Sequence, residues 1–160
     1  MAMALGSSVA LPESVFAKIG EAIIPKTDTP GAIEAGVPGW IEVIVKDCFT
    51  PQNQTVITDG LAEITMRCAK EHGKSIAELE PAAQVAFLTM VDNETKAAKR
   101  TLIEEGREVS NTFLEQFKEL TKFCFVNSEV GATQAFDYQL VPGKWIPDMK
   151  LEPGMKAYAM

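Results

Sequence analysis

The sequence predicts an all-α fold: a single bundle-like domain of about five to six helices, followed by an extended, proline-rich C-terminal arm. Three observations lead to this prediction. Apolar residues recur at helical spacing in successive segments, and prolines and glycines punctuate those segments where helices begin and end. Near the C-terminus, Pro142, Pro147 and Pro153 exclude a helix. We therefore expect a helical domain over residues 12–135 and an arm over residues 136–160.

The length and charge of the chain exclude some classes of function. A chain of 160 residues is the size of one domain and can bury a substantial core. The net charge of -7 and the scattered lysines and arginines argue against nucleic acid as a partner, because a phosphate-binding face needs clustered positive charge. No apolar run reaches the roughly 18 residues of a membrane span, so no direct span is expected.

Residues 1–11 are small and weakly apolar and include Ser8-Val9-Ala10. This pattern is typical of an export signal close to its cleavage point. We interpret the segment as the remnant of a trimmed export signal, the alternative being a remnant of cloning.

The first helix should begin with Pro12 at its first position and end at Ile24, since Pro25 disfavours helical geometry in the residue before it. The loop 25–31 then packs two prolines and a glycine among Lys26, Thr27, Asp28 and Thr29. Asp28 and Thr29 can bond nearby backbone N–H groups, which predicts a loop of defined shape.

A second helix should begin at Pro38 and end at Phe49-Thr50-Pro51, and a third should run from about Gln54 to Glu71. The residues expected on their buried faces are Val37, Trp40, Ile41, Ile44 and Cys48 in the second and Ile57, Leu61, Ile64 and Cys68 in the third.

Ser75 and Glu78 have the spacing of a capping box, and Pro81 opens the next helix. Its apolar residues are Val85, Phe87, Leu88 and Val91. The charged stretch 92–111 is either a solvated helix or a connector, with a break at Gly106.

The last helix should start near Ser110 and carry one buried face. That face consists of Phe113, Leu114, Phe117, Leu120, Thr121 and Cys124. Phe123, Phe125 and Val126 extend the apolar surface most of the way round the final turn, so this turn must be covered by its own domain or by a partner.

The arm is apolar although it is extended. Its apolar residues are Tyr138, Leu140, Val141, Trp145, Ile146, Met149, Leu151 and Tyr158. Such a segment must lie on something: it either crosses its own bundle or docks on another subunit, and at most it forms an edge strand.

No catalytic, cofactor-binding or metal site is predicted. His72 is the single histidine, and no metal-ligand, nucleotide-binding or nucleophile motif is present. Cys48, Cys68 and Cys124 each fall on the apolar face of a helix, which favours buried thiols. A disulfide pair and a cysteine-based redox role are the alternatives.

Two segments carry a resemblance to a known family. They are IIPKTDTPGA at residues 23–32, followed by AGVP at 35–38, and SEVGAT at 128–133, followed by Tyr138 and VPG at 141–143. Together they resemble the opening and closing signatures of the gluconate 2-dehydrogenase subunit 3 family, and the resemblance spans about residues 12 to 145.

The resemblance implies a non-catalytic small subunit of a periplasmic sugar or glycoside dehydrogenase. Its partner would be a large FAD-containing flavoprotein, and a c-type cytochrome, with haem c, would take the electrons onward. The small subunit itself would hold no cofactor and would assist the flavoprotein's maturation and its export by the twin-arginine route. A transient export chaperone, not retained in the mature enzyme, is the alternative.

Combining the two interpretations, we expect the flavoprotein to contact the loop 25–31, the end of the last helix and the arm. The predicted interface residues are Thr27, Asp28, Thr29, Pro30, Phe123, Ser128, Glu129, Tyr138, Val141, Pro142, Trp145 and Ile146. Tyr138 and Trp145 are the expected anchors, since large aromatic side chains often dominate interfaces.

Overall fold

The computed structural model describes residues 13–141, 143 and 147–159, and these residues confirm the all-α prediction. The helices are α1 (Glu13–Ile23), α2 (Val37–Cys48), α3 (Pro51–His72), α4 (Pro81–Glu104) and α5 (Phe113–Val126), with a 3-10 turn η1 (Ile76–Glu78) and a π-helical turn η2 (Gly131–Ala135). Two short strands, β1 (Asp137–Tyr138) and β2 (Tyr158–Ala159), lie in the C-terminal segment.

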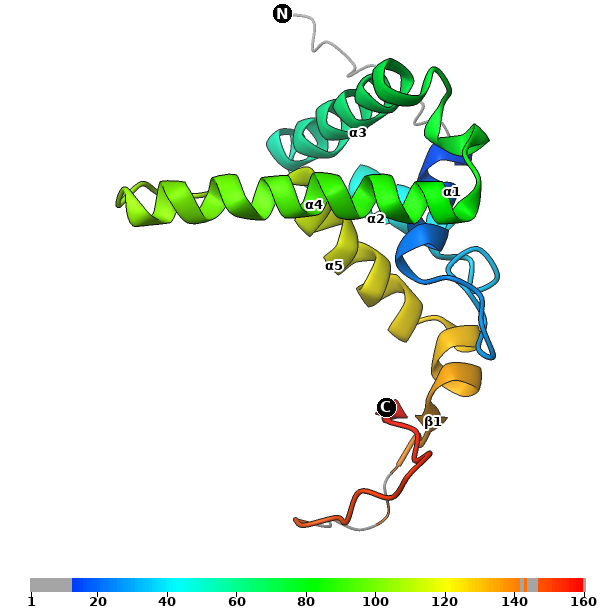
Figure 1. The fold of residues 1–160 in the computed structure, drawn as a ribbon. Coiled ribbons are helices and arrows are strands. Elements are labelled where there is room, and N and C mark those ends of the chain that lie inside the picture. Colours follow the sequence, from blue (N-terminus) through cyan, green and yellow to red (C-terminus); the bar gives the residue numbers. More distant parts are fainter. Residues whose placement is uncertain (1–12, 142, 144–146, 160) are drawn as a thin grey trace, which may run out of the picture.

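Helix α5 occupies the centre of the molecule. It packs against α1, α2 and α3, while α4 crosses the bundle and its far end projects from it (Figure 1). Phe117 of α5 is fully buried and packs against Phe16 of α1 and Phe113, with tilted rings whose centroids lie 5.3 and 5.5 Å apart. The core therefore forms where α5 meets its neighbours.

Side-chain caps and first-turn prolines decide where helices begin. The Thr50 hydroxyl accepts a hydrogen bond from the Asn53 N–H at 3.4 Å, and Pro51 stands at the first helical position of α3. The same Thr50-Pro51 pair that ends α2 thus begins α3, three residues before the predicted start at Gln54. The capping box predicted at Ser75 and Glu78 is confirmed.

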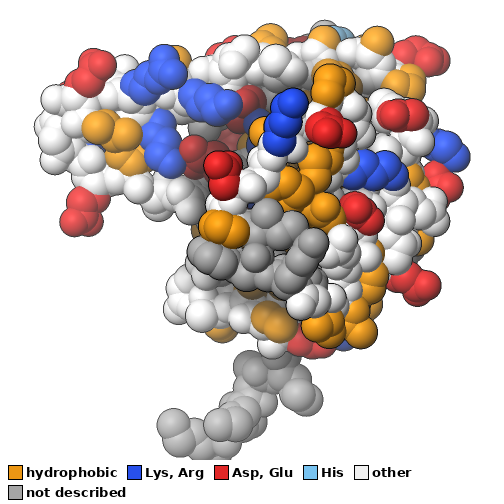
Figure 2. Space-filling model, turned by 90° about the horizontal axis from the view of Figure 1, so that it is seen from below, with side chains coloured by type: hydrophobic (Ala, Val, Ile, Leu, Met, Phe, Trp, Pro, Cys, Tyr) orange, Lys and Arg blue, Asp and Glu red, His pale blue; other side chains and the backbone are white. Residues whose placement is uncertain are grey.

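The charged stretch after Val91 is a continuation of α4 as far as Glu104, so of the two alternatives the solvated helix is correct. Gly106, with φ +72°, supplies the break. Three ion pairs tie this half of α4 to the bundle: Glu94–Arg67 (2.7 Å), Asp92–Lys118 (2.7 Å) and Glu115–Lys99 (2.8 Å). Figure 2 shows side chains of both charges interspersed over this projecting end.

Two predictions of burial are wrong. Trp40 and Cys48 of α2 are exposed. The buried stripe of α2 is Val37, Ile41 and Val45, spaced four residues apart. Trp40 lies about 100° around the helix from Ile41, and Cys48 is the final residue of α2, at the end of the stripe.

The C-terminal segment turns back on itself. After η2 the chain forms β1 and continues away from the bundle. It then turns back, so that β2 pairs with β1 in parallel (Figure 1). Phe136 packs on Phe125, with ring centroids 6.5 Å apart, and the Lys156 ammonium donates to the Gln134 carbonyl at 2.7 Å. We call residues 136–160, which are the predicted arm, the tail.

Candidate functional site

The loop 25–31 is held by one side chain that the sequence analysis did not single out. The carboxylate of Glu21 accepts hydrogen bonds from the N–H groups of Lys26 (3.0 Å), near the start of the loop, and Ile33 (2.9 Å), just after its end. The Ala32 N–H donates to the Ile24 carbonyl at 2.9 Å and closes the loop's base. Glu21, inside α1, therefore sets the loop's shape.

The predicted loop shape exists, but its predicted cause is wrong. Asp28 accepts from the Thr27 hydroxyl at 3.0 Å, and it is Thr27 whose hydroxyl accepts from the Thr29 N–H, at 3.5 Å. Thr27 and Asp28 are exposed at the tip, Thr29 is half-buried and Pro30 is buried. The tip therefore exposes Thr27 and Asp28 to solvent, whereas Pro30 is buried beneath it.

The end of α5 presents a different surface. Phe123 is 58% exposed and Val126 is also exposed, whereas Phe125 is buried. Ser128 is buried: its hydroxyl donates to the Phe125 carbonyl at 2.8 Å and accepts from the Gly131 N–H at 2.9 Å. Ser128 thus shapes the turn after α5.

Of the remaining predicted contact residues, Glu129, Tyr138 and Val141 are exposed, and Pro142, Trp145 and Ile146 lie outside the described residues. Leu140 (77%), Val141 (78%) and Leu151 (85%) are the most exposed large apolar side chains among the described residues. The loop 25–31 and the tail lie toward the same end of the molecule (Figure 1).

One exposed apolar surface was missed altogether. Trp40 and Val43, one turn apart on α2, are exposed, as is Ile33 before them. Their spacing of three residues was the available signal, but apolar periodicity along α2 places Trp40 on the predicted buried face.

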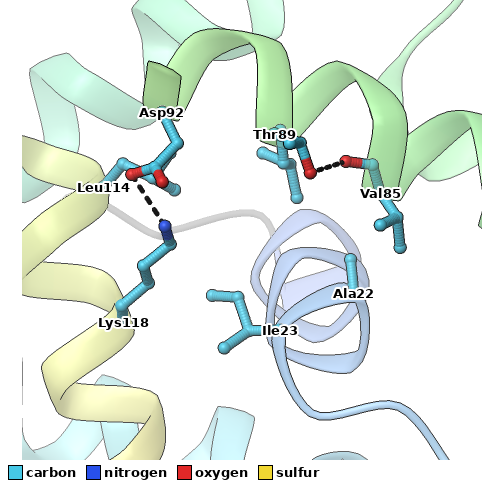
Figure 3. Close-up of a pocket in the computed structure, with 8 residues that line it drawn as sticks. Ala22, Ile23, Val85, Thr89, Asp92, Leu114 and Lys118 are labelled. Carbon is cyan, nitrogen blue, oxygen red and sulfur yellow. Dashed lines mark hydrogen bonds and ion pairs between the residues drawn. The ribbon is translucent and has the colours of Figure 1, made fainter. Parts of the chain in front are cut away.

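A pocket lies where α1, α4 and α5 meet (Figure 3). It is lined by Ala22, Ile23, Val85, Leu88, Thr89, Asp92, Leu114 and Lys118. Its volume of about 190 Å³ is below the range of roughly 300–1,000 Å³ usual for ligand sites.

The polar groups of this pocket are already engaged. Asp92 is held at 2.7 Å by both Lys118 and Lys96, and the Thr89 hydroxyl donates to the Val85 carbonyl. Burial alone would raise the pKa of Asp92, but the hydrogen bonds from Lys118 and Lys96 outweigh it and lower that pKa. The arrangement favours a structural ion pair over acid–base chemistry.

All three cysteines are free, so the disulfide alternative is wrong. Cys68 and Cys124 are buried, and burial raises the pKa of both thiols, which keeps them protonated and unreactive. Among the described residues, no three His, Cys, Asp or Glu side chains gather where they could hold a metal ion. Within the same residues, no helix combines the length and the apolar character needed to cross a membrane.

Comparison with known proteins gives one match. Residues 12–143 match the family model of gluconate 2-dehydrogenase subunit 3, while no curated protein and no solved structure matches. The matched range contains every helix and β1, together with both segments that carried the resemblance. The chain therefore belongs to the gluconate 2-dehydrogenase subunit 3 family, a family of subunits of dehydrogenase complexes.

Proposed function

We propose that this chain is the non-catalytic small subunit of a periplasmic dehydrogenase complex and binds the large FAD-containing flavoprotein that oxidises a sugar or glycoside. Family membership carries the proposal. In this account the flavoprotein holds the FAD and reads the substrate, and a c-type cytochrome with haem c accepts the electrons. The small subunit assists maturation of the flavoprotein and accompanies it through the twin-arginine route.

The distribution of exposed apolar side chains supports a binding role. Leu140, Val141 and Leu151 of the tail expose more of their surface than is usual for side chains of their type, and Phe123 adds an exposed aromatic ring at the end of α5. Clustered exposed apolar groups typically mark interaction surfaces. We therefore assign the partner surface to the tail, the end of α5 and the tip of the loop 25–31.

The test is to purify the tagged chain from its native host under mild conditions and to identify the proteins that accompany it. We expect a flavoprotein with the visible spectrum of FAD and with sugar dehydrogenase activity. A chain that purifies alone would contradict a permanent subunit and would favour the transient chaperone.

A matched pair of variants locates the surface. The triple variant Leu140→Ser, Val141→Ser, Leu151→Ser should lose the flavoprotein without changing the far-UV circular dichroism, because these side chains contribute little to the core. The control is the double variant Met66→Ser, Ile103→Ser. The side chains of Met66 on α3 and Ile103 on α4 are 67% and 57% exposed, and both residues lie far from the tail in the sequence. Equal loss of flavoprotein from both variants would contradict the assignment.

A further inference from the structure

The two-stranded sheet of the tail has an open edge on β1. The Asp137 N–H donates to the Ala157 carbonyl and the Gln139 N–H to the Ala159 carbonyl, both at 2.9 Å. Tyr138 stands between them, opposite Ala159 in the register. Because successive backbone groups of a strand point to alternate edges, the N–H and C=O of Tyr138 point away from β2.

A parallel sheet of only two strands is unusual. Parallel strands are found almost entirely in sheets covered on both faces, and a two-stranded sheet has little stability in water. Here Tyr138 and Tyr158 are exposed, and Leu140, which follows β1, is among the most exposed apolar residues described. Among the described residues, no backbone group bonds to the outer edge of β1, and the side chains of Tyr138 and Leu140 on this strand segment are exposed.

An occupant that meets both needs is an extended peptide. Its backbone would supply a carbonyl to the Tyr138 N–H and an N–H to the Tyr138 carbonyl, and its apolar side chains would cover Tyr138 and Leu140. A helix has its central backbone groups already bonded internally and would leave the edge of β1 unfilled.

We propose that β1 is a template for strand addition: an extended, apolar segment of the flavoprotein pairs with its outer edge and forms a third strand. This inference rests on the proposed function, because it names the way in which the same partner is bound. The tail then becomes part of a sheet shared by two subunits.

The test compares Tyr138→Pro with Tyr138→Ala. Both variants lose the aromatic ring, but only proline loses the outward N–H, and proline is tolerated at a strand edge. The Asp137 and Gln139 donors to β2 remain in both. Binding is measured with the flavoprotein that accompanies the tagged wild-type chain, after it has been separated from that chain.

We expect Tyr138→Pro to bind the flavoprotein roughly fivefold more weakly than Tyr138→Ala, the loss of about one hydrogen bond. Equal affinities of the two variants would overturn strand addition while leaving the subunit assignment intact. Failure of the wild-type chain to bind would overturn the proposed function and this inference with it.

Residue-resolved hydrogen exchange provides a second measurement. In the free chain the Asp137 and Gln139 amides should exchange slowly relative to Tyr138, and in the complex the Tyr138 amide should become protected as well. Protection of the Tyr138 amide in the free chain that increases with its concentration would overturn the proposal, since a second copy of the chain would then fill the edge.

Discussion

Gly60 of α3 permits a close approach to Phe113 of α5. A Cβ at this position would collide with the Cβ and Cγ of Phe113, which cannot swing aside because they lie next to the backbone. We expect Gly60→Ala to destabilise the fold by about 1–3 kcal/mol through overpacking, measured by urea unfolding.

Gly39 on α2 is the matched control, because nothing lies within 4 Å of the position its Cβ would occupy. Gly39→Ala should be neutral or stabilise by about 0.5–1 kcal/mol, the helix-propensity gain. Similar losses in both variants would mean that Phe113 does not constrain Gly60.

The three thiols should differ in reactivity. Cys48 is exposed, whereas Cys68 and Cys124 are buried and have raised pKa values. We expect a maleimide at pH 7 to label one thiol per folded chain quickly, and the other two only on unfolding. Loss of the fast phase in Cys48→Ser identifies the site, and rapid labelling of three thiols would contradict the burial.

At the scale of the element, the loop 25–31 depends on α1. Glu21→Ala removes the acceptor for the Lys26 and Ile33 N–H groups, so both backbone donors lose the hydrogen bond that holds the loop to α1. We expect faster amide exchange through the loop and weaker flavoprotein binding. Glu34→Ala, which removes only the exposed ion pair with Lys26, is the control and should leave the loop unchanged.

The start of α5 should make stability depend on pH. The hydrogen bond from Lys99, followed by that from the Thr112 N–H, lowers the pKa of Glu115. A carboxylate whose pKa is lowered by folding stabilises the fold above its unfolded pKa, and that stabilisation is lost as pH falls through the folded pKa.

We therefore expect Glu115→Gln to cost about 0.5–1 kcal/mol at pH 7, since glutamine keeps the capping box but loses the charge. The difference from wild type should shrink as pH falls below about 4, the region of the unfolded glutamate pKa. Urea unfolding at pH 7 and pH 3 measures this, and a difference independent of pH would contradict the charge pairing with Lys99.

At the scale of the whole molecule, the tail should be separable from the bundle. Deleting residues 137–160 leaves Phe136 to cover Phe125, and the core cluster consists of residues from the helices, η1 and the loop before α2. We expect unchanged helical circular dichroism and loss of the co-purifying flavoprotein. A truncated chain that still carries the flavoprotein would contradict the tail as a binding element.

Helix positions could be predicted because their signals are local. Proline at a first turn, a capping box at Ser75 and Glu78, and apolar residues repeating along α5 act within a few residues of chain. The burial of Trp40 and Cys48 was predicted wrongly because periodicity identifies an apolar face but not the length or width of the neighbour that covers it.

The candidate site, too, could be predicted only in part from the sequence. The signature residues of the loop 25–31 and of residues 128–133 could be recognised in the sequence, and the family match includes both. Glu21, which shapes the loop from the preceding helix, was missed because its bond to Ile33 spans twelve residues. Ser128 was predicted as a contact residue, but its hydroxyl lies inside the turn it stabilises.

The sequence by itself determined the all-α class, the starts of most helices and the family, since each depends on neighbouring residues or on a linear motif. Only the tertiary structure decided that the charged stretch continues α4, held by ion pairs to α3 and α5, and that the tail turns back to pair β2 with β1. Those features arise from contacts between residues distant in the chain, whose energies depend on geometry that no local pattern encodes.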